Sequence, residues 1–261
     1  MEIPERIDFD RVADIYDETR AVPEPFFTKA LDVMERYLDK QERILDIGVG
    51  TGRFARPFQK RGFDMVGIDI SEKMLGVGIS KGLRNAVLAD ARCIPFKDKT
   101  FHSNLSVHLL HLVPDWFEVL QEALRVTRAY LLTYSQFWPE EENVSPNLLY
   151  EELTTKLGCE SEPLGLPEKD LPDLVEPYAR EHIGSRRETV LADERIGRLE
   201  NRIYSGQWSI PDDIHKRVIE EVKSTFAGKK IRMVAHLYVF VWRIEDLNDY
   251  VSLITDESLQ D

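Results

Sequence analysis

The chain has 261 residues, of which 43% are hydrophobic and 31% charged, and a formal net charge of −13 at pH 7. This composition is typical of globular proteins. The acidic balance argues against nucleic acid as the main partner, because affinity for phosphates comes largely from Lys and Arg. The N-terminus lacks the basic and apolar regions of a signal peptide. The longest apolar run, within 233–242, is too short to span a bilayer. The two cysteines are far apart and lack metal-ligand spacing, which is consistent with reduced thiols. We therefore expect a cytoplasmic protein with no membrane span.

The first feature along the chain that indicates a binding site follows a helix predicted over 24–39. Residues 44–47 are predicted to form a short buried strand, with Asp46 near its end, and 53–61 a helix. Between them lie three glycines at alternate positions, Gly48, Gly50 and Gly52. A strand, a glycine turn and a helix N-terminus bring free backbone N–H groups and a positive dipole end together. Glycine also lets the backbone touch a ligand without an intervening Cβ. This arrangement predicts a nucleotide-type site.

The identity of the nucleotide depends on Asp46. Residues 50–55 satisfy the G-x-G-x-x-A dinucleotide fingerprint, which is a weak signal alone. However, a carboxylate at the strand end would repel a pyrophosphate, whereas it suits a ligand with an ammonium group, such as S-adenosylmethionine. An NAD site and a glycine turn that binds nothing remain as alternatives from this segment.

Two further apolar runs also end in acidic residues. Residues 64–68 precede Asp69, and a helix is predicted over 72–80. In an α/β unit, an acid at the end of the second strand reaches the ribose hydroxyls of a nucleotide. The alternative role for Asp69 is to cap the following helix. A third strand, predicted at 86–89, leads into Asp90 and a turn.

The remaining elements indicate the architecture. Strands at 103–107 and 129–135 flank a helix at 115–127, and this alternation implies a parallel sheet with right-handed crossovers. After a proline-rich excursion with a probable helix near 148–157, we expect a strand at 178–185, helices at 189–204 and 212–226, and a strand at 231–244 inserted antiparallel as the seventh. Long excursions between core strands tend to be functional lids.

Four segments resemble one family. They are F-D-R-V-A-D-I-Y-D-E-T-R at 9–20, D-I-G-V-G-T-G at 46–52, D-A-R-C-I-P-F at 90–96, and F-H-S-N-L-S-V-H-L-L-H-L-V-P-D-W at 101–116. Together they are similar to class I S-adenosylmethionine-dependent methyltransferases of the ubiquinone-biosynthesis-like, type 11 group. The match runs from residue 9 to about 138, and it departs from the family at His102 and Asn104, which place polar groups on a central strand.

The resemblance implies a Rossmann-like α/β fold with a seven-stranded, mostly parallel sheet, helices on both faces and a helical lid after the fifth strand. It divides the chain into N-terminal cap helices (1–40), a cofactor-binding core (41–138), a substrate-side lid containing a probable sixth strand (139–228), and a last strand with a C-terminal tail (229–261).

The resemblance also implies the site. The tyrosine and arginine of the N-terminal segment would lie near the methyl group and the methionine carboxylate, and Asp90 near the adenine amino group. The implied cofactor contacts are Tyr16, Arg20, Asp46, Gly48, Val49, Gly50, Thr51, Gly52, Asp69, Ile70, Met74, Asp90, Ala91, Arg92, Ser106, Val107 and His111. Candidates for a catalytic group are His108, His111 and Tyr16.

The expected reaction is in-line transfer of a methyl group to a small-molecule acceptor, with S-adenosylhomocysteine as product. The segment Ser106-Val107-His108-Leu109 differs from the N-P-P-Y tetrad of nucleic-acid amino-methyltransferases. An NAD-dependent oxidoreductase would need a Tyr-x-x-x-Lys or similar pair, which the sequence does not show. A non-catalytic protein that binds S-adenosylmethionine is a second alternative. The acceptor and the oligomeric state are left open.

Overall fold

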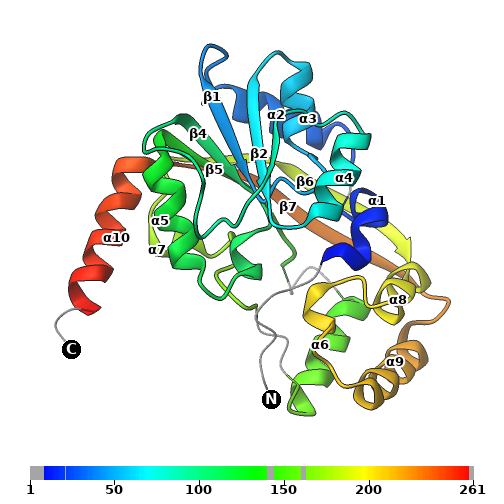
Figure 1. Ribbon diagram of the computed structural model, residues 1–261. Coiled ribbons are helices and arrows are strands. Elements are labelled where there is room, and N and C mark those ends of the chain that lie inside the picture. The colour runs from blue at the N-terminus through cyan, green and yellow to red at the C-terminus, as the bar shows by residue number, and fades with distance from the viewer. Residues whose placement is uncertain (1–8, 21, 140–143, 160–162, 259–261) are drawn as a thin grey trace. The chain divides into compact units, whose positions relative to one another are not determined.

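The computed structural model describes residues 9–258 except 21, 140–143 and 160–162. The chain divides into two compact units (Figure 1). Within the described residues, the first unit comprises the chain up to Ser135, then Leu164–Ile183, and then the chain from Tyr238 onward. The second unit comprises Gln136–Pro163 and Gly184–Leu237.

The central element is a seven-stranded sheet in the order β3-β2-β1-β4-β5-β7-β6. Its strands are β1 (Arg43–Ile47), β2 (Asp64–Asp69), β3 (Ala86–Leu88), β4 (Phe101–Ser106), β5 (Thr127–Phe137), β6 (Ala179–Leu191) and β7 (Lys230–Arg243). The pairs β1–β2, β1–β4, β2–β3 and β4–β5 are parallel. Because β7 lies between β5 and β6, the predicted insertion of the last strand is confirmed.

Helices cover both faces of the sheet in the first unit. The chain runs from β1 through β2 to β3 in one direction, and β4 and β5 lie on the other side of β1. Right-handed crossovers therefore place α3 (Ala55–Lys60) and α4 (Glu72–Ser80) on one face and α5 (Trp116–Val126) on the other. Figure 1 shows α5 beside α10 (Ile244–Ser258), away from α2 (Phe26–Glu35), α3 and α4. The first unit also holds the one-turn helix α7 (Leu171–Leu174).

The core of the first unit is built on the parallel strands. Ile44, Leu45 and Ile47 of β1 are fully buried, as expected for a strand covered on both faces. The polar residue on β4 that the sequence places in the core, Asn104, is accommodated by hydrogen bonds. Its Nδ2 donates to Ala123 O at 3.3 Å and to Thr127 Oγ1 at 2.8 Å, so part of its polarity is satisfied inside the core.

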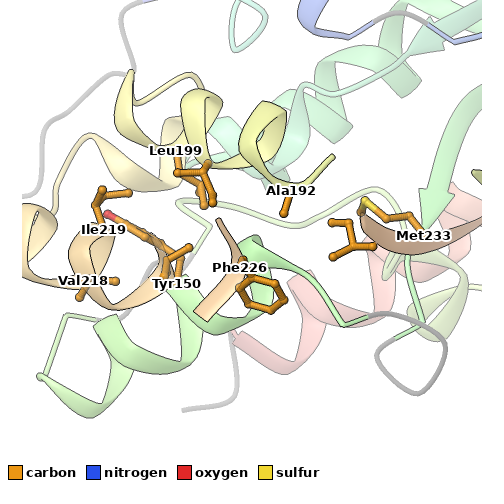
Figure 2. Close-up of a cluster of buried hydrophobic side chains, with 10 residues drawn as sticks. Tyr150, Ala192, Leu199, Val218, Ile219, Phe226 and Met233 are labelled. Carbon is orange, nitrogen blue, oxygen red and sulfur yellow. The ribbon is translucent and has the colours of Figure 1, made fainter. Parts of the chain in front are cut away.

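The second unit has its own apolar core. It contains α6 (Pro146–Lys156), α8 (Ala192–Glu200) and α9 (Asp212–Phe226), which contact one another pairwise. Figure 2 shows side chains from these helices and from β7 converging on one cluster. Its buried members are Tyr150, Ala192, Ile196, Leu199, Val218, Ile219, Val222, Phe226, Ile231 and Met233. This cluster gives the second unit a hydrophobic interior formed by three helices and part of β7.

Several predicted elements differ from the structure. The N-terminal segment is a 3₁₀ helix, η1 (Phe9–Ile15), followed by one turn of α-helix, α1 (Tyr16–Thr19), and its Asp10 and Asp17 side chains form hydrogen bonds with the core. The predicted tail contains α10, whose apolar residues recur at helical spacing. The helix predicted at 189–204 is shorter because β6 continues to Leu191.

The predicted stretch 139–228 is also divided differently, since residues 164–183 lie with the sheet in the first unit. The role of this stretch as a lid stays a prediction.

Candidate functional site

A cavity of about 540 Å³ lies in the first unit at the C-terminal ends of β1, β2, β3 and β4. The strand order reverses between β1 and β4, and ligands of open α/β sheets bind at such a switch point. The walls come from the N-terminal segment, the loop after β1 and the loops after β2, β3 and β4. Its volume is in the range of sites for nucleotide-sized or drug-sized ligands.

The loop after β1 brings its backbone close to the cavity. Gly48, Gly50 and Gly52 all have positive φ, at 70°, 53° and 78°. A Cβ on Gly50 would lie 3.0 Å from Met74 Cε, and one on Gly48 would lie 3.0 Å from Leu109 Cδ1. Glycine is therefore required here both for the backbone conformation and for the space beside the cavity.

Asp46 places a carboxyl group at the base of the cavity, and only 4% of the residue is exposed. Burial raises the pKa of this carboxyl to about 7, against the opposing effects of a backbone hydrogen bond and the charge of Arg53. A carboxyl group in this state is ionised more readily when a cation binds beside it.

Asp69 ends β2 and holds two neighbouring backbone groups. Gly50 N donates to its Oδ2 and Ser71 N to its Oδ1, both at 2.8 Å. The N-cap of α4 is Ser71, whose Oγ accepts from Met74 N at 3.0 Å. Asp69 is therefore not the helix cap. Each carboxylate oxygen can accept a further hydrogen bond, and the residue lines the cavity.

Asp90 lies at the end of β3 with its carboxylate paired to Arg92. The Arg92 Nη2 lies 2.8 Å from Asp90 Oδ2, and its Nη1 lies 2.8 Å from Asp115 Oδ2. Arg92 N also donates to Asp90 Oδ1 at 2.9 Å. These bonds fix the 90–92 turn at the cavity wall.

The loop after β4 carries His108 and His111, whose ring centroids are 6.2 Å apart. His108 lines the cavity and adopts a positive φ of 59°, which is uncommon outside glycine. Burial and the nearby charge of Arg53 lower its pKa to about 3, so its ring stays neutral. His111 Nδ1 lies 3.0 Å from Oε2 of Glu168, which is only 5% exposed.

The N-terminal segment contributes Phe9, Asp10 and Tyr16 to the cavity wall. It is tied to the core by Ser71 Oγ, which donates to Asp10 Oδ1 at 2.5 Å. Asp17 accepts from Thr51 Oγ1, and its Oδ2 lies 2.8 Å from Lys81 Nζ and 3.3 Å from Arg56 Nη2. These bonds hold the segment against the loop after β1 and against α4.

The predicted site residues divide between the cavity wall and the structure behind it. The cavity is lined by Tyr16, Asp46, Gly48, Val49, Gly50, Asp69, Ile70, Met74, Asp90, Ala91, Arg92, Val107 and His108. The predicted residues outside the lining are Arg20, Thr51, Gly52, Ser106 and His111. Thr51 is fully buried and binds Asp17, and the Arg20 guanidinium lies over the Tyr16 ring at 5.9 Å.

Three functional candidates were missed in the sequence. Arg53 lines the cavity, and its Nη1 donates to Arg20 O at 2.6 Å. Its position directly after the third glycine could have indicated it. Asp17 stands in the N-terminal motif without an assigned role. Glu168 lies 57 residues from His111 in the chain, in a segment with no recognisable motif, so no local signal pointed to it.

Comparison with known proteins indicates a methyltransferase domain within the first unit. The model of a family described as a methyltransferase domain matches residues 45–130. An uncharacterized protein of Methanocaldococcus jannaschii is 32% identical over 120 residues, covering 46% of this chain and 56% of that protein. A demethylmenaquinone methyltransferase of Thermobifida fusca is 33% identical over 132 residues, covering 46% of this chain and 55% of the enzyme. The chain thus spans about half the length of these relatives.

A solved structure of a Bacillus subtilis protein superimposes with a TM-score of 0.52 at 21% identity, covering 83% of this chain and 99% of that one. This likeness supports the fold. Within the described residues, no helix has the length and apolar character needed to cross a membrane.

Proposed function

We propose that the protein transfers a methyl group from S-adenosylmethionine to a small-molecule acceptor, because the model of a methyltransferase domain matches residues 45–130. The observation that carries the proposal is the cavity beside the positive-φ glycine loop, with Asp46, Asp69 and Asp90 at the ends of three adjacent strands.

The described residues fit the cofactor. Gly48 and Gly50 line the cavity without a side chain, so a ligand can approach their backbone. A buried carboxyl at Asp46 suits the ammonium group of the methionine end. Asp69 would accept from the ribose hydroxyls, and the turn at Asp90 and Ala91 would meet the adenine.

For the methionine carboxylate, we propose Arg53 beside Arg20. Arg53 lines the cavity and its charge acts on both Asp46 and His108, while Arg20 lies outside the lining and its charge acts on His108. The role predicted for Arg20 stays a prediction, and its carbonyl oxygen accepts a hydrogen bond from the Arg53 guanidinium.

The sulfonium of the cofactor supplies a methyl group that is already activated, so the protein mainly aligns the two reactants. Such positioning can contribute about 7–11 kcal/mol to lowering the barrier. The N-terminal segment, fixed through Asp17, would cover the donor and exclude water. Tyr16 would lie beside the reacting groups, and Ser106 and Val107 would offer backbone oxygens. The acidic net charge of −13 favours a small acceptor over a nucleic acid.

Two alternatives were carried from the sequence. The family match does not favour an NAD-dependent oxidoreductase. A non-catalytic protein that binds the same cofactor shares the donor site, and only methyl transfer separates it from an enzyme.

The test is calorimetry with S-adenosylhomocysteine, S-adenosylmethionine and NAD, followed by incubation with methyl-labelled S-adenosylmethionine and pooled small metabolites. We expect both adenosyl compounds to bind, NAD not to bind, and label to appear in a small product. Tight NAD binding would overturn the proposal, and cofactor binding without transfer to any acceptor would favour the binding protein.

A further inference from the structure

Glu168 joins the 164–170 segment to the loop that follows β4. Its Oε1 accepts from Leu109 N and, at 2.9 Å, from Leu110 N, and its Oε2 faces His111 Nδ1 at 3.0 Å. Both segments belong to the first unit. One buried carboxylate therefore orients both the backbone of the loop and the imidazole that the loop carries.

The contact between the two segments is also close at the backbone. Gly165 N donates to His111 O at 3.2 Å. A Cβ on Gly165 would lie 2.1 Å from Val113 O and 2.2 Å from Leu110 O. Only glycine permits this approach, so the position of Glu168 beside His111 is fixed by packing as well as by hydrogen bonds.

The hydrogen bond determines which nitrogen of His111 carries the proton. Burial would raise the pKa of Glu168, but the hydrogen bond and charge of His111 outweigh it and hold the pKa below the usual range, so the carboxyl is ionised near neutral pH. An ionised carboxylate only accepts hydrogen bonds. In a neutral ring, Nδ1 must then be the donor, which leaves a lone pair on Nε2. Within the described part of the chain, Nε2 has no hydrogen-bond partner.

The two histidines of this loop have different surroundings. His108 stands in the cavity wall beside Arg53, which disfavours its protonated form. His111 Nδ1 faces a carboxylate oxygen of Glu168 at 3.0 Å, and 28% of the His111 side chain is exposed. Its neighbours Leu109 and Leu112 line the cavity, and so does His108, whose ring centroid is 6.2 Å from that of His111, so His111 lies next to the lining without being part of it. Of the pair, His111 is the one whose ring nitrogen is held by a buried carboxylate.

We propose that Glu168 is a positioning residue that holds His111 with Nε2 as the proton acceptor of methyl transfer, and that the acceptor substrate therefore presents a hydroxyl group. This rests on the proposed function. In the step, the hydroxyl oxygen bonds to the methyl carbon as the carbon–sulfur bond breaks, the sulfur keeps the electron pair as a thioether, and the hydroxyl proton moves to His111 Nε2. An amine acceptor would have less need of this base, because its nitrogen has a free lone pair.

The first test reads the tautomer without any acceptor. Nitrogen-15 NMR of the wild-type protein with S-adenosylhomocysteine, with His111 assigned by comparison with His111→Gln, should show the proton on Nδ1. In Glu168→Gln, the amide can donate to Nδ1 while its oxygen still accepts from the loop, so the proton should move to Nε2. Glu176→Gln, an exposed change further along the chain, should leave the tautomer unchanged. A wild-type ring protonated on Nε2 would overturn the proposal.

The second test compares acceptors. Purified protein is given labelled S-adenosylmethionine with matched phenols and anilines. Wild type should methylate hydroxyl groups, and Glu168→Gln should slow this by about 10²–10⁴-fold in kcat, the usual contribution of a general base. Its affinity for S-adenosylhomocysteine and any transfer to amines should change little. Transfer by wild type to amines alone, or an unchanged kcat in a folded Glu168→Gln, would overturn the inference while leaving the proposed function intact. Failure of wild type to bind the cofactor would instead overturn the proposed function, and the tautomer would still be readable.

Discussion

The cavity has two walls that are built in different ways. The wall formed by the loop after β1 and the ends of β2 and β3 depends on backbone conformation and on three acids at strand ends. The wall formed by the loop after β4 depends on a side chain, Glu168, that comes from 57 to 59 residues further along the chain. The glycines and acids of the first wall can be recognised from short motifs. The contact of Glu168 with the loop after β4 forms only when the chain folds.

This difference has a physical origin. A glycine loop between a strand and a helix produces its N–H groups and its positive φ angles locally. The contact between the partly exposed His111 and the buried Glu168 needs two distant segments to be brought together. The first wall should therefore respond to changes within its own motif, and the second to changes far away in sequence.

The largest effect expected on the first wall is that of Asp69→Ala. Hydrogen bonds to a charged group contribute about 1.5–3 kcal/mol each, so losing those to the ribose should lower affinity for S-adenosylhomocysteine about tenfold to several hundredfold. The ligand-free protein should also lose stability, because Gly50 N and Ser71 N lose their acceptor. Calorimetry and thermal unfolding measure both.

The control for Asp69 is Asp64→Ala, at the other end of β2. Asp64 is half-exposed, with an ion pair to Arg43 at 3.6 Å, and such pairs contribute about 0–1 kcal/mol. It should alter neither affinity nor stability appreciably. If Asp69→Ala kept full affinity, Asp69 would be assigned to loop structure alone.

A second effect concerns the pH dependence of cofactor binding. With a pKa of about 7 in the ligand-free protein, Asp46 is mostly protonated below that pH and must release its proton when a cation binds beside it. Affinity should therefore fall by up to about tenfold per pH unit below 7 and level off above it. Calorimetry across pH 5.5–8.5 measures this.

The contribution of Asp46 to the stability of the folded protein should decrease as pH rises, whereas its contribution to cofactor affinity should increase. Its folded pKa is raised above the unfolded value, so the folded state binds the proton more tightly, and this contribution is lost as pH rises through about 7. The difference in unfolding free energy between wild type and Asp46→Asn isolates it from other groups. A difference that does not depend on pH would contradict the raised pKa.

The smallest expected effect comes from two glycine substitutions, which distinguish backbone strain from loss of contact with the ligand. Gly50→Ala and Gly62→Ala both place a Cβ at positive φ, 53° and 90°, and each should lose about 1–2 kcal/mol of stability. Nothing lies within 4 Å of a Cβ on Gly62, whereas Gly50 lines the cavity. Only Gly50→Ala should also weaken cofactor binding. Equal affinities in the two variants would show that the ligand does not approach this backbone.

Much of the fold could be predicted, because the strands that carry the sheet are short apolar runs with clear breaks between them. The predicted helix 72–80 coincides with α4, and 212–226 coincides with α9. Predictions were less accurate where tertiary contacts replaced local pattern. The segment 9–20 is a 3₁₀ helix with one α-helical turn, and hydrogen bonds of Asp10 and Asp17 join it to the core.

The sequence by itself predicted the seven-stranded sheet. It also predicted the glycine loop and the strand-end acids of the wall formed by the loop after β1 and the ends of β2 and β3, because these features follow from local sequence. Only the tertiary structure decided that Arg53 rather than Arg20 lines the cavity, that Ser71 rather than Asp69 caps α4, and that Glu168 meets His111. These three results depend on where side chains from separate segments come to lie, and that is fixed by packing between segments distant in sequence.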